Sequence, residues 1–303
     1  MCDGRSHNRI LSLSPSYLRD SATRLASANV NNQILSLSSP LLPEATTNDF
    51  STKRSPACLS DITAFHAALA MAQTARGWPR VGFKIDGGHG EDPFFGALCS
   101  RDVHRISYKQ MRTALPRPWA EYLPRGIQLE LVAILNTSLP PKAKSELYTI
   151  EHIKKAVSRW VPAIAFSGTR LRPPKGRQIH SLLRIADGAL HGSLLMIEDA
   201  PKINIDKWGG SENEAILSAD DEILARGNGS NPFSALVWLT NEINRLGLPP
   251  LESGDVISTG GMLTTGLTHV KQGASVKAEW SPDISVHFQM PFSTATMNAD
   301  DEV

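Results

Sequence analysis

The stretch Pro124–Leu135 reads PRGIQLELVAIL, and it alternates in the way of a buried strand that carries two polar residues. Side chains on a strand point alternately to two faces. Gln128 and Glu130 therefore share one face, and the isoleucine and leucines around them share the other. Taking a carboxylate out of water without a partner is costly. The partner of this face is a metal, another cation, a substrate or an internal hydrogen bond, and the stretch alone leaves all four open.

Short apolar runs bounded by glycine and proline predict further strands. They cover residues 80–85, where the run leads into a turn at Gly87–Gly88, and residues 161–166, 255–259, 275–280 and 284–290. Few long helical patterns separate these strands, so a doubly wound parallel sheet is not expected. The sequence predicts an α+β fold, a mixed and mainly antiparallel β roll with peripheral helices.

The peripheral helices follow from apolar residues at helical spacing. The clearest begins with Asn231 as N-cap and Pro232 in its first turn, and ends at Gly247. Others are predicted over residues 15–30, over residues 61–77, and from Thr149 through Val157, ahead of the strand at 161–166.

The charge balance excludes several classes of partner. The 303 residues contain 31 lysines and arginines and 30 acidic residues, a formal net charge of +1, so no nucleic-acid or acidic-membrane surface is indicated. No apolar run approaches the ~20 residues of a membrane span. A small molecule is the expected partner.

Cysteine usage and the N-terminal residues indicate a cytoplasmic protein. Three cysteines, an odd number with no metal-ligand spacing, argue against both a disulfide framework and a zinc site: Cys2, Cys58 and Cys99. The first residues do not resemble a secretory signal. Arginines among the early serines leave a transit peptide open, although Asp3 and Asp20 count against it.

Several segments, in this order, together resemble the fumarylacetoacetate hydrolase superfamily, and within it the 2-keto-4-pentenoate hydratase and 4-oxalocrotonate decarboxylase branch. They are residues 81–85, 93–96, 124–135, 161–170, 186–189, 231–247 and 254–260. The resemblance divides the chain into residues 1–78, an N-terminal helical segment with a flexible start, and residues 79–303, a fumarylacetoacetate hydrolase-like catalytic domain. It leaves a homo-oligomer open.

The resemblance implies a divalent cation, usually Mg²⁺ or Mn²⁺, held by a Glu-x-Glu pair and a third carboxylate, with a lysine that matches Lys84 beside it. A hard cation of this kind chelates a 2-keto acid and stabilises a dienolate. This sequence departs from the pattern, because Gln128 replaces the first glutamate and Ala165 aligns with the third carboxylate. A further acid, expected in the 93–96 segment, is Phe94. Glu130 remains as the one metal ligand, and an altered metal site is predicted.

Each candidate residue also has a structural interpretation. Lys84 and Glu130 are the proposed catalytic pair, or else a lysine at a strand end and a paired core carboxylate. Gln128 is a substrate hydrogen-bonder or a satisfied core amide.

Four further residues complete the predicted substrate-binding set. Arg170 would clamp a carboxylate, or is a loop charge. His191 is a base or a structural histidine. The Thr259 hydroxyl and Gly260, in a strand-end turn, would bind a substrate carboxylate, although Gly260 and Gly261 are also what a turn requires.

The resulting function is a lyase-type enzyme, a hydratase, dehydratase or decarboxylase that acts on a small unsaturated 2-keto acid or related enol, breaking a carbon–oxygen or carbon–carbon bond. A reaction without metal is open. The alternatives are an isomerase or cyclase of secondary metabolism, and a non-catalytic homologue that serves as a binding or scaffolding subunit.

Overall fold

A computed structural model describes residues 35–36, 74–75, 77–88, 91–109, 126–143, 145–167, 171–172, 188–189, 191–208, 214–229, 231–263 and 268–290. The predicted helices over 15–30 and 61–77 therefore lie outside the described residues, apart from the end of the second. There Gly77 has a φ of +79°, and its amide donates to the carbonyl of Thr74 over 2.9 Å. The predicted division at residue 78 stays a prediction. No helix in the described ranges is long and apolar enough to cross a membrane.

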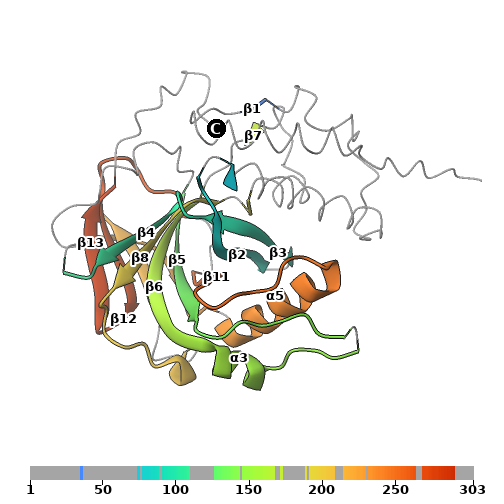
Figure 1. Ribbon diagram of the computed structural model, residues 1–303. Helices are drawn as coiled ribbons and strands as arrows, with labels where there is room; N and C mark the ends of the chain where they lie inside the picture. The colour runs from blue at the N-terminus through green and yellow to red at the C-terminus, as the bar shows by residue number, and fades with distance from the viewer. Residues whose placement is uncertain are drawn as a thin grey trace, which may run out of the picture.

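The described strands form a mainly antiparallel mixed fold, which confirms the predicted class. A seven-stranded sheet has the order β3 (Glu91–Cys99), β2 (Arg80–Gly88), β11 (Val256–Gly261), β5 (Gly126–Leu135), β6 (Val157–Ser167), β8 (His191–Glu198) and β4 (Val103–Ser107). Only the β11–β2 and β4–β8 pairs of this sheet are parallel. Figure 1 shows how the sheet curls.

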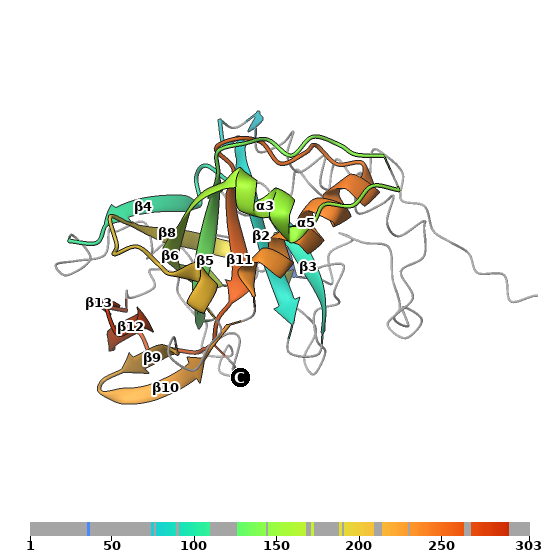
Figure 2. The ribbon, with the colours of Figure 1, turned by 90° about the horizontal axis from the view of Figure 1, so that it is seen from below.

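A second sheet packs on part of the first. It has four strands in the order β10 (Glu222–Gly227), β9 (Ala215–Ala219), β12 (Ser275–Ser281) and β13 (Ile284–Gln289). Figure 2 shows this sheet as a separate layer. The described part of the chain also includes a parallel pair of two-residue strands, β1 (Leu35–Ser36) and β7 (Leu171–Arg172), and the short 3-10 helix η3 (Ile205–Lys207).

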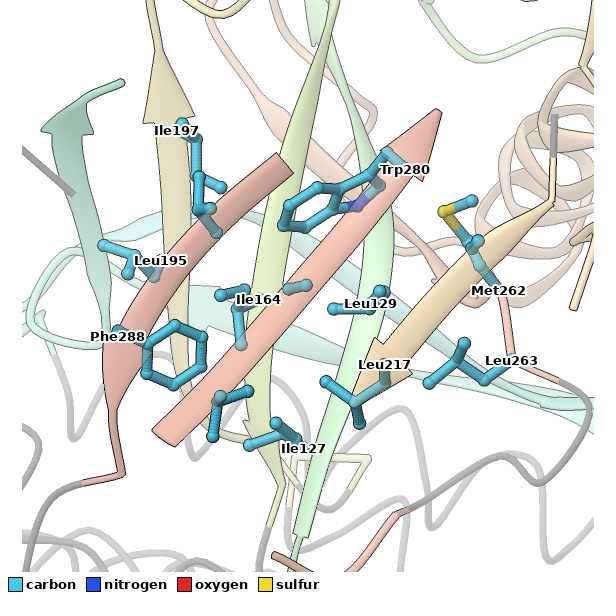
Figure 3. Packing of buried hydrophobic residues seen from close by; sticks show 14 of the residues in the cluster. Ile127, Leu129, Ile164, Leu195, Ile197, Leu217, Met262, Leu263, Trp280 and Phe288 are labelled. Carbon is cyan, nitrogen blue, oxygen red and sulfur yellow. The ribbon is translucent and has the colours of Figure 1, made fainter. Parts of the chain in front are cut away.

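One face of the large sheet is apolar and completely covered. Along β5, Ile127, Leu129 and Leu131 pack against the second sheet, where the indole of Trp280 is fully buried (Figure 3). Further along the same strand, Ala133 and Leu135 pack on the helices. The apolar face of β5 thus packs against the second sheet along one part of the strand and against the helices along another.

The helices cover the end of that face, as Figures 1 and 2 show. Helix α5 (Pro232–Leu246) begins and ends as predicted. The Asn231 side chain accepts a hydrogen bond from the amide of Phe233, and Gly247 has a φ of +66°, where glycine has no Cβ to clash. Buried residues of α5 such as Phe233, Leu236 and Ile243 form its core stripe.

Two predicted boundaries were wrong. Helix α3 (Ile150–Ala156) ends one residue before Val157, because Val157 begins β6 and pairs with Leu135 of β5. Strand β2 does not stop before Gly87–Gly88 but continues through both, with a register shift between Asp86 and Gly88. The extra residue of this bulge lies in β3, and Gly87, between the two shifted pairs, has a φ of +92°, which glycine adopts without a Cβ clash.

Gly82 lies where strands β2 and β11 approach each other closely. A Cβ at this position would lie 1.8 Å from the carbonyl oxygen of Val256, its register partner in β11. Gly82→Ala should therefore force the β2–β11 pair apart and lower the free energy of unfolding by about 3 kcal/mol or more. Urea denaturation measures this loss.

The control for this variant is Gly247→Ala. Gly247 has open space around its Cβ position and a left-handed backbone, so this change should cost only about 1 kcal/mol. Equal losses for the two variants would contradict the close approach at Gly82.

Candidate functional site

The second face of the large sheet carries the candidate site. Lys84 of β2 is in register with Ser258 of β11, and Ser258 is in register with Val132 of β5. Register partners share a face, so Lys84 lies on the face of β5 that carries Gln128 and Glu130. An apolar cluster that includes Val132, Ala163 and Ala165 surrounds these polar residues.

Lys84 is completely buried and is the centre of the polar residues. Its ammonium donates to Gln128 Oε1 over 2.7 Å and to Ser167 Oγ over 3.1 Å. The Ser167 hydroxyl itself donates to Gln128 Oε1 over 2.7 Å. The interpretation of Lys84 as a strand-end lysine with its head in water is therefore wrong.

Two carboxylates stand near the same ammonium. Glu130 Oε1 lies 3.5 Å from the Lys84 nitrogen, and Asp86 Oδ2 lies 3.7 Å from it. Both distances are ion-pair distances, longer than a direct hydrogen bond. The residues Asp86, Gln128, Glu130 and Ser167 are called the oxygen cage below.

Glu130 is the cage residue whose side-chain oxygens lack hydrogen bonds in the described part of the chain. Its side chain is fully buried, and neither carboxylate oxygen has a hydrogen-bond partner among the described residues. Burial, with a smaller contribution from the Asp86 charge, raises the pKa of the carboxyl to about 7, because the loss of water outweighs the attraction of Lys84. A carboxyl of this kind exchanges its proton near neutral pH.

The backbone of Glu130 is held from the other side of the sheet. The Trp280 indole donates to the carbonyl oxygen of Glu130 over 3.0 Å. The bond forms where the register of β11 against β5 shifts between Ser258 and Gly261. The two faces of β5 are therefore coupled at this one residue.

Gly261 leaves the space that Gln128 occupies. A Cβ on Gly261 would stand 3.3 Å from Gln128 Nε2, closer than most real contacts allow. Gly260 lies within β11, not in the predicted strand-end turn, and its φ of +97° occurs at the bulge where the register against β5 shifts. No interaction of Gly260 with a ligand is tested, and its binding role stays a prediction.

The remaining predicted residues lie at different distances from the cage. His191 is buried and stands opposite Ser167 in the β6–β8 register, so it adjoins the cage on the next strand. The Thr259 hydroxyl donates to the carbonyl of Leu131 over 2.8 Å, so its proton already has an acceptor. Arg170 lies outside the described residues. The roles of all three stay predictions.

The structure adds two residues that the sequence interpretation did not name. Asp86 follows Lys84 by two positions on β2, and Ser167 follows Ala165 by two positions on β6. A period of two predicts a shared face in both cases. Asp86 is also in register with Phe94, where the resemblance predicts an acid, so a carboxylate is present on the neighbouring strand.

The donor set of the cage does not fit a divalent cation. Gln128 and Ala165 stand directly opposite each other in the β5–β6 register, and neither has a carboxylate. The Lys84 ammonium lies among the oxygens that remain, and the described ranges contain no group of three or more histidine, cysteine or acidic side chains placed to hold a metal. A hard divalent ion requires more anionic oxygen than this and is repelled by the ammonium.

Comparisons with known proteins agree on one branch. No family model matches the chain. It is 28% identical to a 2-keto-4-pentenoate hydratase of Burkholderia vietnamiensis over 57% of the chain and 61% of that relative, and 27% identical to the hydratase of Paraburkholderia phymatum over 62% of the chain and 70% of that relative. The match with the first relative thus spans less than two thirds of its length.

The fold comparison covers more of the chain. The structure of 4-oxalocrotonate decarboxylase from Pseudomonas putida G7, solved with calcium and acetate and also with magnesium and adipate, superposes with a TM-score of 0.68 at 15% identity over 91% of this chain and 98% of that one. The chain is thus similar in sequence to 2-keto-4-pentenoate hydratases and in fold to 4-oxalocrotonate decarboxylase. This confirms the resemblance inferred from the sequence. The altered metal site stays a proposal.

The raised pKa of Glu130 predicts a pH dependence of stability. The unfolded chain releases this proton near pH 4.5, and the folded chain holds it until about pH 7. The folded state binds more protons between these values, so its stability should fall as the pH rises through this window. Glu130→Gln keeps the shape and cannot ionise.

Urea denaturation of both proteins across this window measures the effect. The wild type should lose more stability than Glu130→Gln as the pH rises. Parallel curves for the two proteins would contradict an ionisable buried Glu130.

Proposed function

We propose that this protein is a lyase-type enzyme that acts on a small unsaturated 2-keto acid or related enol without a divalent metal. The relatives named 2-keto-4-pentenoate hydratase support the substrate class and the reaction class. The decarboxylase of the same fold has been solved in complexes that contain a carboxylate and a divalent cation, acetate with calcium and adipate with magnesium. One observation carries the proposal, namely a buried ammonium beside a buried carboxyl with a pKa of about 7.

The two groups suit the chemistry of a dienolate. Hydration, dehydration and decarboxylation of an unsaturated 2-keto acid all pass through a negative charge that develops on the keto oxygen. A fixed ammonium in a dry site stabilises that charge strongly. In the proposed reaction Lys84 faces this oxygen, and Glu130 gives a proton to carbon or takes one from it.

The neighbouring residues position the pair. Gln128 and Ser167 hold the ammonium with direct hydrogen bonds, so its place does not depend on the protonation of Glu130. We propose that Arg170 binds the substrate carboxylate, with His191, Thr259 and Gly260 contributing to the same subsite. We also propose a cytoplasmic location, which agrees with a buried Cys99 that carries a free thiol.

Substitution of the pair tests the function. On a panel of unsaturated 2-keto acids, Glu130→Gln should lower kcat about 100-fold or more, because general acid–base catalysis contributes about 10² to 10⁴-fold. Lys84→Met should lower kcat/KM by a similar factor through the lost charge. The surface variant Lys277→Met serves as the control and should keep full turnover.

The outcome also separates the alternative interpretations. Unchanged turnover in Glu130→Gln and Lys84→Met would remove the proposed pair. A wild-type protein that turns over no member of the panel, yet binds one of them, would favour the non-catalytic homologue.

Metal addition tests the metal-free reaction separately. Because a ligand that binds the native state raises the melting temperature, Mg²⁺ or Mn²⁺ at millimolar concentration should leave it unchanged. Turnover should be equally insensitive to a chelator. A saturable rise in melting temperature with either ion would contradict the metal-free proposal.

A further inference from the structure

The oxygen cage surrounds the Lys84 nitrogen. Four oxygen atoms from strands β2, β5 and β6 lie within 3.7 Å of it. The two nearest, from Gln128 and Ser167, are neutral and lie at 2.7 and 3.1 Å. The two charged oxygens are farther away. Oxygen atoms arranged around one centre are what a monovalent cation binds, and an ammonium has the same charge.

The hydrogen bonds of the cage favour the ammonium over the neutral amine. Gln128 Oε1 can only accept hydrogen bonds, and the Ser167 hydroxyl already donates its hydrogen bond to that same oxygen. The Asp86 carboxylate also accepts only. The Gln128 amide nitrogen lies beside Gly261, while its oxygen faces Lys84, so the remaining cage residue that could donate to the Lys84 nitrogen is a protonated Glu130, 3.5 Å away. A neutral amine would therefore have no donor at hydrogen-bond distance for its lone pair.

We propose that the oxygen cage is a monovalent-cation site whose occupant is the chain's own ammonium. Lys84 supplies the positive charge in place of a bound ion. Glu130 alone moves the proton in the proposed reaction. This inference assigns roles within the site of the proposed function, while its test uses stability and needs no turnover.

Removal of the lysine side chain should leave a site for a small external cation. In Lys84→Ala the space of the missing aminopropyl group opens while the four oxygens remain. Ethylammonium chloride should raise the melting temperature of this variant saturably, by about 3 °C or more at tenfold excess over its dissociation constant. Sodium and choline chloride at the same concentration should not, and wild type should not respond to ethylammonium specifically.

Lys84→Met is the matched control. Methionine fills most of the same space without a charge, so this variant should be less stable than wild type and should gain nothing from ethylammonium. If Lys84→Ala does not fold in buffer, the yield of folded protein after refolding with and without ethylammonium gives the same comparison. The double variant Lys84→Ala/Gln128→Leu, which lacks the nearest oxygen, should bind ethylammonium more weakly.

Three outcomes would overturn the proposal. The first is a Lys84→Ala variant that responds equally to ethylammonium, sodium and choline. The second is a Lys84→Met variant as stable as wild type. The third is stronger stabilisation of Lys84→Ala by Mg²⁺ than by ethylammonium, since a cage that prefers a divalent ion is not a monovalent-cation site. Loss of the proposed enzymatic activity leaves these melting temperatures interpretable.

Discussion

A fully buried ammonium is the constraint on which the site depends. Lys84 has no contact with water, and a charge in this position is stable only if oxygen atoms replace its hydration. The replacements come from Asp86 of its own strand, Gln128 and Glu130 of β5, and Ser167 of β6. The alignment of these strands is therefore fixed by the ammonium as well as by their backbone hydrogen bonds. A slip of one residue in β5 would turn both of its polar side chains into the apolar core on the other face.

Strand β5 connects the core to the chemistry. Its apolar face lies between the second sheet and the helices, and its polar face bears half of the oxygen cage. The Trp280 bond to the Glu130 carbonyl joins these functions at one residue. The same burial that stabilises the fold raises the pKa of the Glu130 carboxyl to about 7, because a dry site disfavours its charge. The burial that stabilises the fold and the raised pKa on which the proposed proton transfer depends thus have a common physical origin.

This chain shares its fold with 4-oxalocrotonate decarboxylase. The decarboxylase of this fold has been solved with calcium and with magnesium, both divalent ions. At the corresponding face this chain has an amide at 128 and a methyl group at 165, and its remaining oxygens surround one ammonium. A cage with two carboxylates and two neutral oxygens, in which the neutral oxygens are nearest the centre, matches a single positive charge better than a double one.

The sequence by itself determined the fold class and most of the elements. Period-two alternation identified β5, β12 and β13, and the Asn231 and Gly247 caps located α5, because these signals depend on neighbours a few residues apart. The alternation also placed Gln128 and Glu130 on one face. Apolar residues at helical spacing located α3 but not its end, because the pairing of Val157 with β5 is a long-range effect.

Only the tertiary structure decided what that polar face contacts. Lys84 and Gln128 are 44 residues apart, and Lys84 and Ser167 are 83 apart, so no local pattern links them. A spacing of two places Asp86 and Ser167 on the face of Lys84 and Ala165, but it does not say which residues of other strands they meet. Their role depends on the register between strands, which the sequence periodicity does not specify. The space beside Gly261, into which the Gln128 amide nitrogen fits, depends on the same register.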